Sequence, residues 1–147
     1  MQVELLPSSV PASESQFLVS FLINDRVAID AGPLGLLADL ARQRGVRHIF
    51  LTHEHVDHIA SLPIFLDNVY EPGPDCVELL GGANLLDFLH RDIFNGRVWP
   101  DFFDLSTDDN RFVRATPLEP GQSVTRSGLT VTAVPVQHSV DTFGYLV

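Results

Sequence analysis

The sequence contains no lysine: all nine basic residues are arginine, and 19 aspartates and glutamates bring the net charge to −10. Without lysine, these residues offer neither a Schiff-base amine nor a P-loop lysine for phosphate binding. The acidic balance also disfavours broad electrostatic binding to a nucleic-acid polymer. It does not exclude a small anion that is held by a metal ion and a local arginine.

Cysteine and long apolar runs are scarce as well. The single cysteine, Cys76, excludes an internal disulfide and fits a reducing compartment, so we expect a cytoplasmic protein. Residues 1–4 lack the basic start and apolar core of a signal peptide. No apolar run is long enough to cross a bilayer, so no membrane partner is expected. A length of 147 residues suits about one domain.

Histidine, in contrast, is concentrated in one short segment. Three of the six histidines lie in Thr52-His53-Glu54-His55-Val56-Asp57-His58. This segment follows the apolar run 47–51, which is typical of a buried strand, and precedes a helical pattern that begins at Ile59. A strand-to-helix loop on a rigid scaffold can aim several side chains at one point.

The residue types in this loop are those that bind divalent metals. Neutral imidazole and carboxylate are good ligands for zinc and similar metals. His53 and His55 are two residues apart and can face the same side, and Asp57 and His58 follow as the chain turns into the helix. Such a set suits a two-metal site. The alternatives are solvated polar residues on a loop, or a structural zinc site, which would more often use several cysteines.

The pattern His-x-His-x-Asp-His, preceded by Asp30-Ala31-Gly32 after a strand, resembles that of the metallo-β-lactamase-fold hydrolases. The resemblance implies that His53 and His55 bind a first metal, and that Asp57 and His58 bind a second. It also implies a third ligand for the first metal after a later strand, where His138 stands. Three protein ligands and an open position are the pattern of a catalytic zinc.

Asp30 has two interpretations. It ends a predicted strand near the presumed site, where its carboxylate could orient a ligand histidine. Alternatively, it satisfies the Gly32-Pro33 turn.

A second distinctive stretch runs from Asp92 to Phe102. Its Asn95 and Trp99 are candidate substrate-binding residues if the aromatic side chains form a wall for a planar base, and Arg97 could neutralise a phosphate. The alternatives are core packing under a long loop, the commoner role of aromatic residues, and a solvated arginine. Within the metallo-β-lactamase fold, Phe-Asn…Trp-Pro, together with Leu66-Asp67-Asn68, resembles the class II cyclic-nucleotide phosphodiesterases.

The resemblance implies an α/β (α+β) fold, the four-layer αββα sandwich of two similar halves. Residues 1–147 would form a single incomplete domain that holds the first half and the start of the second. The aspartate that bridges both metals and the last histidine are then expected beyond Val147. We therefore expect a truncated stretch of a longer protein, inactive by itself.

The function implied is hydrolysis of 3′,5′-cyclic nucleotides, cAMP or cGMP, by attack of metal-bound hydroxide on phosphorus. Two Zn²⁺ are expected in the complete protein, with Mn²⁺ or Fe²⁺ possible, and Asp57 would orient or deprotonate the water as well as bind metal. The partner is a small cyclic nucleotide, and a homodimer is possible because dimers are common in that family. The alternatives are a tRNA 3′-processing endonuclease, a thioester or lactam hydrolase of the same fold, and a non-catalytic metal-binding remnant.

The patterns also predict the elements. Helices are expected at 35–44, with Gly45 as C-cap, and at 59–69 and 83–94. Strands are expected at 3–6, 16–23, 26–30, 47–51, 76–80, 111–118, 122–125, 129–134 and 142–147.

Overall fold

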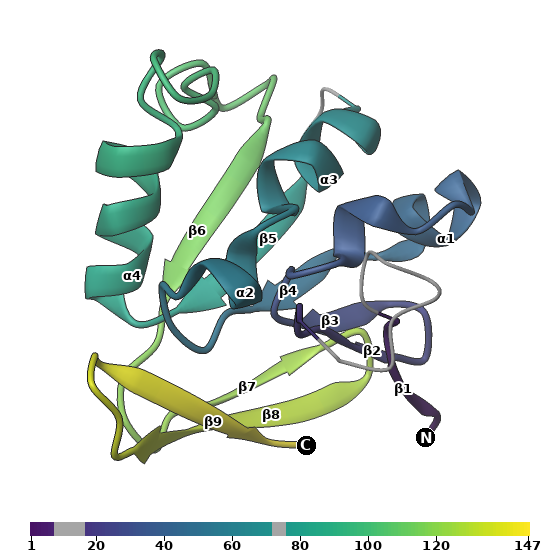
Figure 1. Ribbon diagram of the computed structural model, residues 1–147, viewed down its shortest axis with the longest axis vertical. Helices are drawn as coiled ribbons and strands as arrows, with labels where there is room; N and C mark the ends of the chain where they lie inside the picture. The colour runs from purple at the N-terminus through teal and green to yellow at the C-terminus, as the bar shows by residue number, and fades with distance from the viewer. Residues whose placement is uncertain (8–16, 72–75) are drawn as a thin grey trace.

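The computed structural model describes residues 1–7, 17–71 and 76–147. The segments 7–13 and 71–75, whose composition predicts loops, lie mostly outside these ranges, as does Gln16, the first residue of the strand predicted at 16–23. The described residues form two β-sheets and a layer of helices (Figure 1).

The larger sheet has six strands in sequence order. Its first three strands pair antiparallel, and the third to sixth pair parallel. The parallel strands therefore end at one edge of the sheet, where ligands commonly bind in α/β folds. The six strands are β1 (Val3–Leu5), β2 (Phe21–Ile23), β3 (Val27–Ile29), β4 (His48–Phe50), β5 (Val77–Gly81) and β6 (Val113–Pro117).

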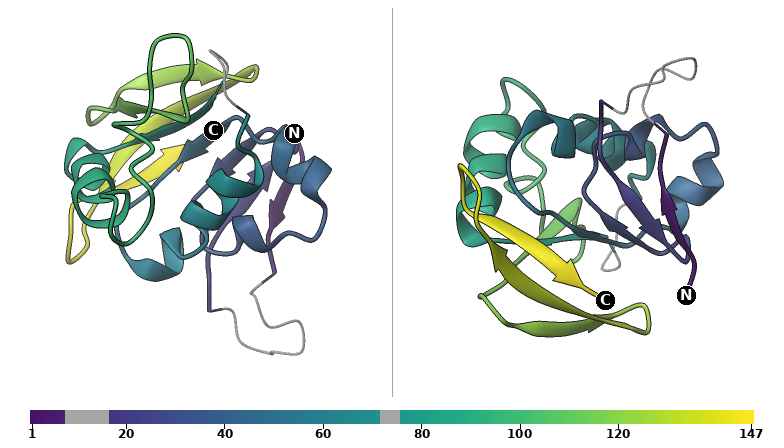
Figure 2. Two further views of the ribbon diagram at one scale, coloured as in Figure 1. Left: turned by 90° about the horizontal axis from the view of Figure 1, so that it is seen from above. Right: turned by 60° about the horizontal axis from the view of Figure 1, so that its bottom comes forward.

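Helices cover one face of this sheet, and a smaller antiparallel sheet lies against the other face (Figures 1 and 2). From Val113 onward the regular elements are all strands. The layers are thus helix, sheet, sheet, as predicted for the first half of an αββα sandwich and the start of the second. The helical elements are η1 (Leu34–Leu36), α1 (Leu40–Gly45), α2 (Val56–Ile59), α3 (Leu62–Asn68), α4 (Ala83–Phe88) and the π-helix η2 (Leu89–Ile93). The smaller sheet contains β7 (Ser123–Arg126), β8 (Leu129–Val136) and β9 (Thr142–Leu146).

Alternate residues of the central strands pack in two separate cores, because successive side chains of a strand point to opposite faces. Ile49 and Leu79 belong to the core under the helices. Phe50 and Leu80 belong to the core between the two sheets, where Val131 of β8 also lies. Burial on both faces explains why these strands are apolar runs without alternation.

The prediction of one continuous helix at 35–44 was wrong. The chain forms η1 and then starts again at α1, because Asp39 caps that helix by accepting hydrogen bonds from the backbone N–H groups of Ala41 (2.9 Å) and Arg42 (3.3 Å). Gly45 is the last residue of α1, and Val46 occupies the C-cap position.

The predicted helix 59–69 starts earlier and is broken. α2 begins at Val56 and therefore includes Asp57 and His58, and α3 begins at Leu62. Pro63 lies in the first turn of α3, where its missing N–H needs no helical partner.

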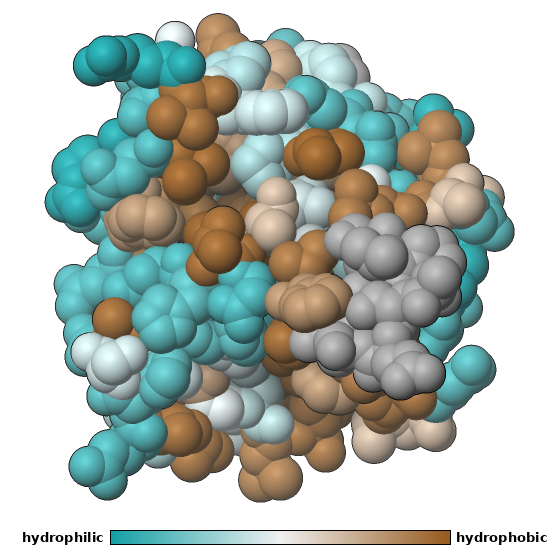
Figure 3. All heavy atoms as spheres, in the orientation of Figure 1, coloured by the Kyte–Doolittle hydropathy of each residue, from teal (hydrophilic) through white to brown (hydrophobic). Residues whose placement is uncertain are grey.

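The surface has no dominant apolar face in the view of Figure 3, where hydrophilic atoms gather over α2 and the tip of the β8–β9 hairpin. In the part of the chain that the structure describes, every helix is too short or too polar to cross a membrane.

Candidate metal centre

The histidine loop joins the end of β4 to α2 and is fixed through its backbone. The carbonyl oxygen of Asp57 accepts a hydrogen bond from the N–H of Val19 (2.9 Å), and that of His58 accepts one from Ala31 (2.7 Å). Gly32 makes this packing possible, because a Cβ there would overlap the backbone oxygen of Asp57. The loop is therefore held by the segments around Val19 and Asp30-Ala31-Gly32.

Three imidazoles converge beside this loop. Ligand nitrogens of His53, His55 and His138 all lie within 4.8 Å of one another. Nε2 of His53 is 3.0 Å, and Nε2 of His138 is 3.4 Å, from Nδ1 of His55. Two ligands on one zinc, with bonds of about 2.0–2.1 Å and tetrahedral angles, would be about 3.4 Å apart.

The other nitrogen of His53 is held in place. Nδ1 of His53 lies 2.8 Å from Oγ1 of Thr52, and this hydroxyl lies 2.9 Å from Oδ2 of Asp30. With the hydroxyl donating to the carboxylate, it accepts from Nδ1–H, which leaves Nε2 of His53 with a lone pair for a metal. Orientation of a ligand histidine through its second nitrogen is typical of metal sites.

Burial favours the same state of His53. The side chain is 5% exposed, and desolvation, followed by the neighbouring His58, lowers the pKa of this imidazole. A neutral imidazole is the form that binds zinc.

His58 and Asp57 lie next to this cluster. Nδ1 of His58 donates to Oδ2 of Asp30 at 2.6 Å, and this hydrogen bond raises the pKa of His58. Nε2 of His58 is 3.4 Å from Oδ2 of Asp57. The carboxylate of Asp30 thus contacts His58 directly and reaches His53 through the hydroxyl of Thr52. The described residues fit zinc in both ligand type and spacing.

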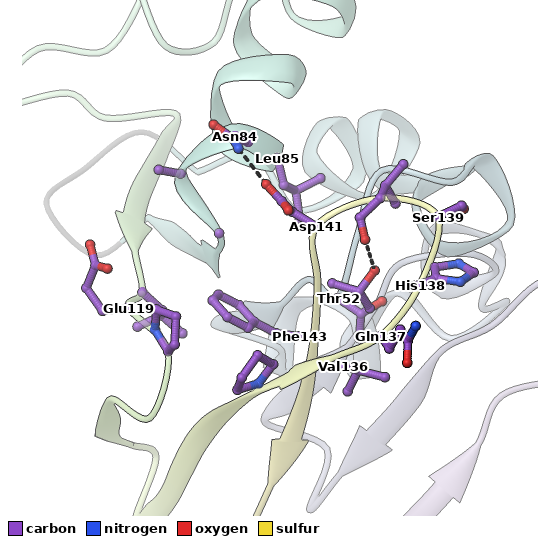
Figure 4. Close-up of a pocket in the computed structure, with 17 residues that line it drawn as sticks. Thr52, Asn84, Leu85, Glu119, Val136, Gln137, His138, Ser139, Asp141 and Phe143 are labelled. Carbon is purple, nitrogen blue, oxygen red and sulfur yellow. Dashed lines mark hydrogen bonds between the residues drawn. The ribbon is translucent and has the colours of Figure 1, made fainter.

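His138 reaches the cluster from the tip of the β8–β9 hairpin, 83 positions beyond His55. The same hairpin tip borders a pocket of about 550 Å³ that the start of α4 closes on another side (Figure 4). Thr52, Asn84, His138 and Phe143 are among the residues that line this pocket.

A model of the β-lactamase superfamily domain matches residues 25–147, which include all five proposed ligands. The chain belongs to this superfamily.

Curated relatives of the superfamily include two phosphodiester-cleaving enzymes. The chain is 26% identical over 136 residues to 3′,5′-cyclic-nucleotide phosphodiesterase 1 of Saccharomyces cerevisiae, covering 80% of this chain and 36% of that protein. It is 30% identical over 162 residues to ribonuclease Z of Limosilactobacillus fermentum, covering 100% of this chain and 48% of that protein. The chain thus spans less than half the length of either relative.

Solved structures show the same metallo-β-lactamase fold. Unliganded yeast PDE1 gives a TM-score of 0.65 at 15% identity, covering 97% of this chain and 59% of that one. The short form of human tRNase Z gives a TM-score of 0.60 at 18% identity, covering 99% of this chain and 64% of that one. A zinc-bound neighbour is PqqB of Methylobacterium extorquens, with a TM-score of 0.57 at 15% identity, covering 82% and 43%.

The structure does not bring Asn95 and Trp99 to the histidines. They follow η2, whereas the pocket is bordered by the start of α4, and neither residue lines that pocket. Trp99 packs against the core under the helices, which is the alternative that the sequence left open. Asn95 organises its own loop, since its Oδ1 accepts from the N–H groups of Arg97 and Val98 at 3.0 Å each.

Sequence reasoning missed Thr52, whose hydroxyl connects His53 to Asp30. Its position directly before the histidine motif was the available signal. His48, at the start of β4, lies outside the cluster, with its Nδ1 3.1 Å from the buried carboxylate of Glu78.

Proposed function

We propose that this chain carries the first set of ligands of a metal-dependent phosphodiesterase that hydrolyses 3′,5′-cyclic nucleotides. Membership of the superfamily supports a hydrolase. The observation that carries the proposal is the convergence of His53, His55 and His138, with Asp57 and His58 beside them.

In the proposed site, Nε2 of His53, Nδ1 of His55 and Nε2 of His138 would hold the first metal, and Asp57 and His58 would contribute to the second. Bound metal would supply Lewis acidity, which activates water and stabilises charge on phosphoryl oxygens. Asp30 and Thr52 fix the ligand imidazoles before substrate arrives. In this proposal, the carboxylate of Asp57 would orient the attacking water and accept its proton.

Charge favours a small substrate over a polynucleotide. With 19 acidic residues, nine arginines and no lysine, the chain offers little attraction to a long phosphate backbone. A cyclic nucleotide carries one phosphate, which metal can neutralise. The pocket beside His138 has room for the remainder of such a molecule, and it combines apolar Leu85 and Phe143 with polar Asn84 and Asp141.

A specific observation also favours tRNA 3′ processing: the ribonuclease Z alignment covers the whole chain. That function needs a basic docking surface, which these residues do not supply through lysine.

The deciding experiment uses the full-length protein, loaded with zinc or stripped by a chelator. Cyclic AMP, cyclic GMP and a tRNA precursor with a 3′ extension are compared as substrates, with Asp57→Asn as the inactivated control. Metal-dependent hydrolysis of a cyclic nucleotide, lost in the variant, supports the proposal. Preferential cleavage of the tRNA precursor would favour the tRNA 3′-processing function instead. Zinc binding without turnover would indicate a non-catalytic metal-binding protein.

A further inference from the structure

The segment 137–141, which carries His138, has little packing to hold it. All of it is exposed except the half-buried Val140. On its inner side lies the pocket of about 550 Å³ instead of tightly packed side chains. The position of His138 must therefore depend on a small number of directed interactions.

Within the described residues, two side-chain hydrogen bonds join this segment to the part of the chain that contains the six-stranded sheet and its helices. One links His138 to His55 at 3.4 Å and would be replaced by metal coordination. The other runs from Nδ2 of Asn84, in the first turn of α4, to Oδ2 of Asp141 at 2.7 Å. In Figure 4 these two side chains face each other across the rim of the pocket.

The flanks of the segment are fixed more firmly. Val136 and Thr142 are paired across β8 and β9, and the N–H of Phe143 donates to the carbonyl oxygen of Thr52 at 3.1 Å. The tip can therefore move only as a short loop between two anchored ends. The bond at Asp141, three residues after His138, restricts that movement from the side of α4.

We infer that Asn84 and Asp141 are positioning residues, which hold the hairpin tip so that Nε2 of His138 faces the other two imidazoles. This inference rests on the metal centre proposed above. The pair does not contact the metal; it reduces the number of loop conformations that binding would otherwise have to select, which is how a preorganised site gains affinity.

The test measures zinc affinity by chelator competition and the absorption spectrum of the cobalt-substituted protein, using the full-length chain. Asn84→Ala and Asp141→Ala should each weaken first-site affinity by about threefold to tenfold, the range expected for one hydrogen bond. They should also shift the cobalt spectrum, because one imidazole no longer holds its place. The double variant should be no weaker than either single variant, since both remove the same bond.

The decisive variant exchanges the pair. Asn84→Asp combined with Asp141→Asn keeps a carboxylate–amide hydrogen bond with its direction reversed, and should restore the affinity and the spectrum. Asp108→Ala, an exposed carboxylate on another loop paired with Arg111, is the charge-matched control and should bind zinc as the wild type does.

The outcomes separate the two proposals. If the wild-type protein binds no zinc, the proposed metal centre itself is refuted. Zinc binding that all Asn84 and Asp141 variants retain at full affinity would overturn the positioning role alone. An exchanged pair as weak as the single variants, or an equal loss in Asp108→Ala, would also overturn it. A lower melting temperature of the metal-free variants with unchanged zinc affinity would reveal a purely structural bond.

Discussion

Oδ2 of Asp30 lies 2.6 Å from Nδ1 of His58, and Asp30 makes this contact from a left-handed backbone conformation (φ 62°). Aspartate tolerates this conformation better than most residues. The side chain is almost completely buried, yet its oxygens also accept hydrogen bonds from the N–H and hydroxyl of Thr52. One carboxylate thereby orients His58 of the second proposed ligand set directly and His53 of the first set through Thr52.

Asp30→Asn should weaken zinc binding by about 10- to 100-fold, the usual cost of losing a partner that orients ligand histidines. The neutral amide no longer accepts strongly from both His58 and Thr52. Isothermal titration or chelator competition measures the effect. Asp108→Asn, a fully exposed change of the same charge, serves as control, and equal affinity of Asp30→Asn and the wild type would exclude the orienting role.

His138→Ala should abolish tight binding at the first site, because only His53 and His55 would remain there. His58→Ala should spare the first site and reduce the amount of metal bound at the second. Metal content after gel filtration, determined by mass spectrometry, distinguishes these cases. Ser139→Ala, the next residue of the same exposed loop, should leave the metal content unchanged, and a loss in this control would mean that the loop is merely sensitive to substitution.

Gly32→Ala should destabilise the fold by about 1–3 kcal/mol, as overpacking commonly does. The added methyl group would overlap the backbone oxygen of Asp57, and it would lie 2.5 Å from the backbone nitrogen of Val19. Urea unfolding monitored by circular dichroism measures the loss. Gly82→Ala is the matched control, because its methyl group would meet only a ring carbon of Phe143 at an ordinary 3.6 Å.

The acid stability of the fold should depend on Glu78. Burial alone would raise the pKa of this carboxyl, but hydrogen bonds from Arg126 and Thr116 outweigh burial and lower the pKa to about 2. Because the folded pKa lies below the ordinary 4.5, the stabilisation is present above about pH 4.5 and is lost as the pH falls toward 2. The contribution is on the order of 3 kcal/mol.

Glu78→Gln should therefore be less stable than wild type at pH 7, and the difference should shrink as the pH falls from 5 to 2. Urea unfolding across this range measures the difference. The exposed Glu119→Gln should follow the wild-type curve. A constant gap between Glu78→Gln and wild type at all pH values would show that the charge is unimportant.

The sequence predicted most strands well, although only Phe21–Ile23 of the strand predicted at 16–23 forms a strand. The central strands were predictable because they are buried on both faces and are therefore apolar runs. Ile49 and Phe50 must each enter a different core, so both are hydrophobic. Helix boundaries were predicted less well, since the break before Leu40 depends on a single cap by Asp39. The apolar spacing that predicted one helix at 35–44 continues across Asp39 and therefore hides this cap.

The candidate site divides in the same way. His53, His55, Asp57 and His58 are local, and their spacing alone indicated a metal site. The distances among them, and the contribution of Thr52, follow from hydrogen bonds to Asp30 that join separate strands. The packing of Trp99 against the core was one of two open interpretations, because composition does not tell which face of a loop an aromatic ring takes.

The two sheets meet directly beside the histidine loop. The hydroxyl of Tyr145 in β9 donates to the carbonyl oxygen of Leu51 (2.7 Å), and the N–H of Phe143 donates to that of Thr52 (3.1 Å). A metal held by His53, His55 and His138 would therefore connect the two sheets, as a disulfide connects distant parts of a secreted domain. Zinc would act as a reversible cross-link here, and its binding would add to the free energy that is needed to separate the sheets.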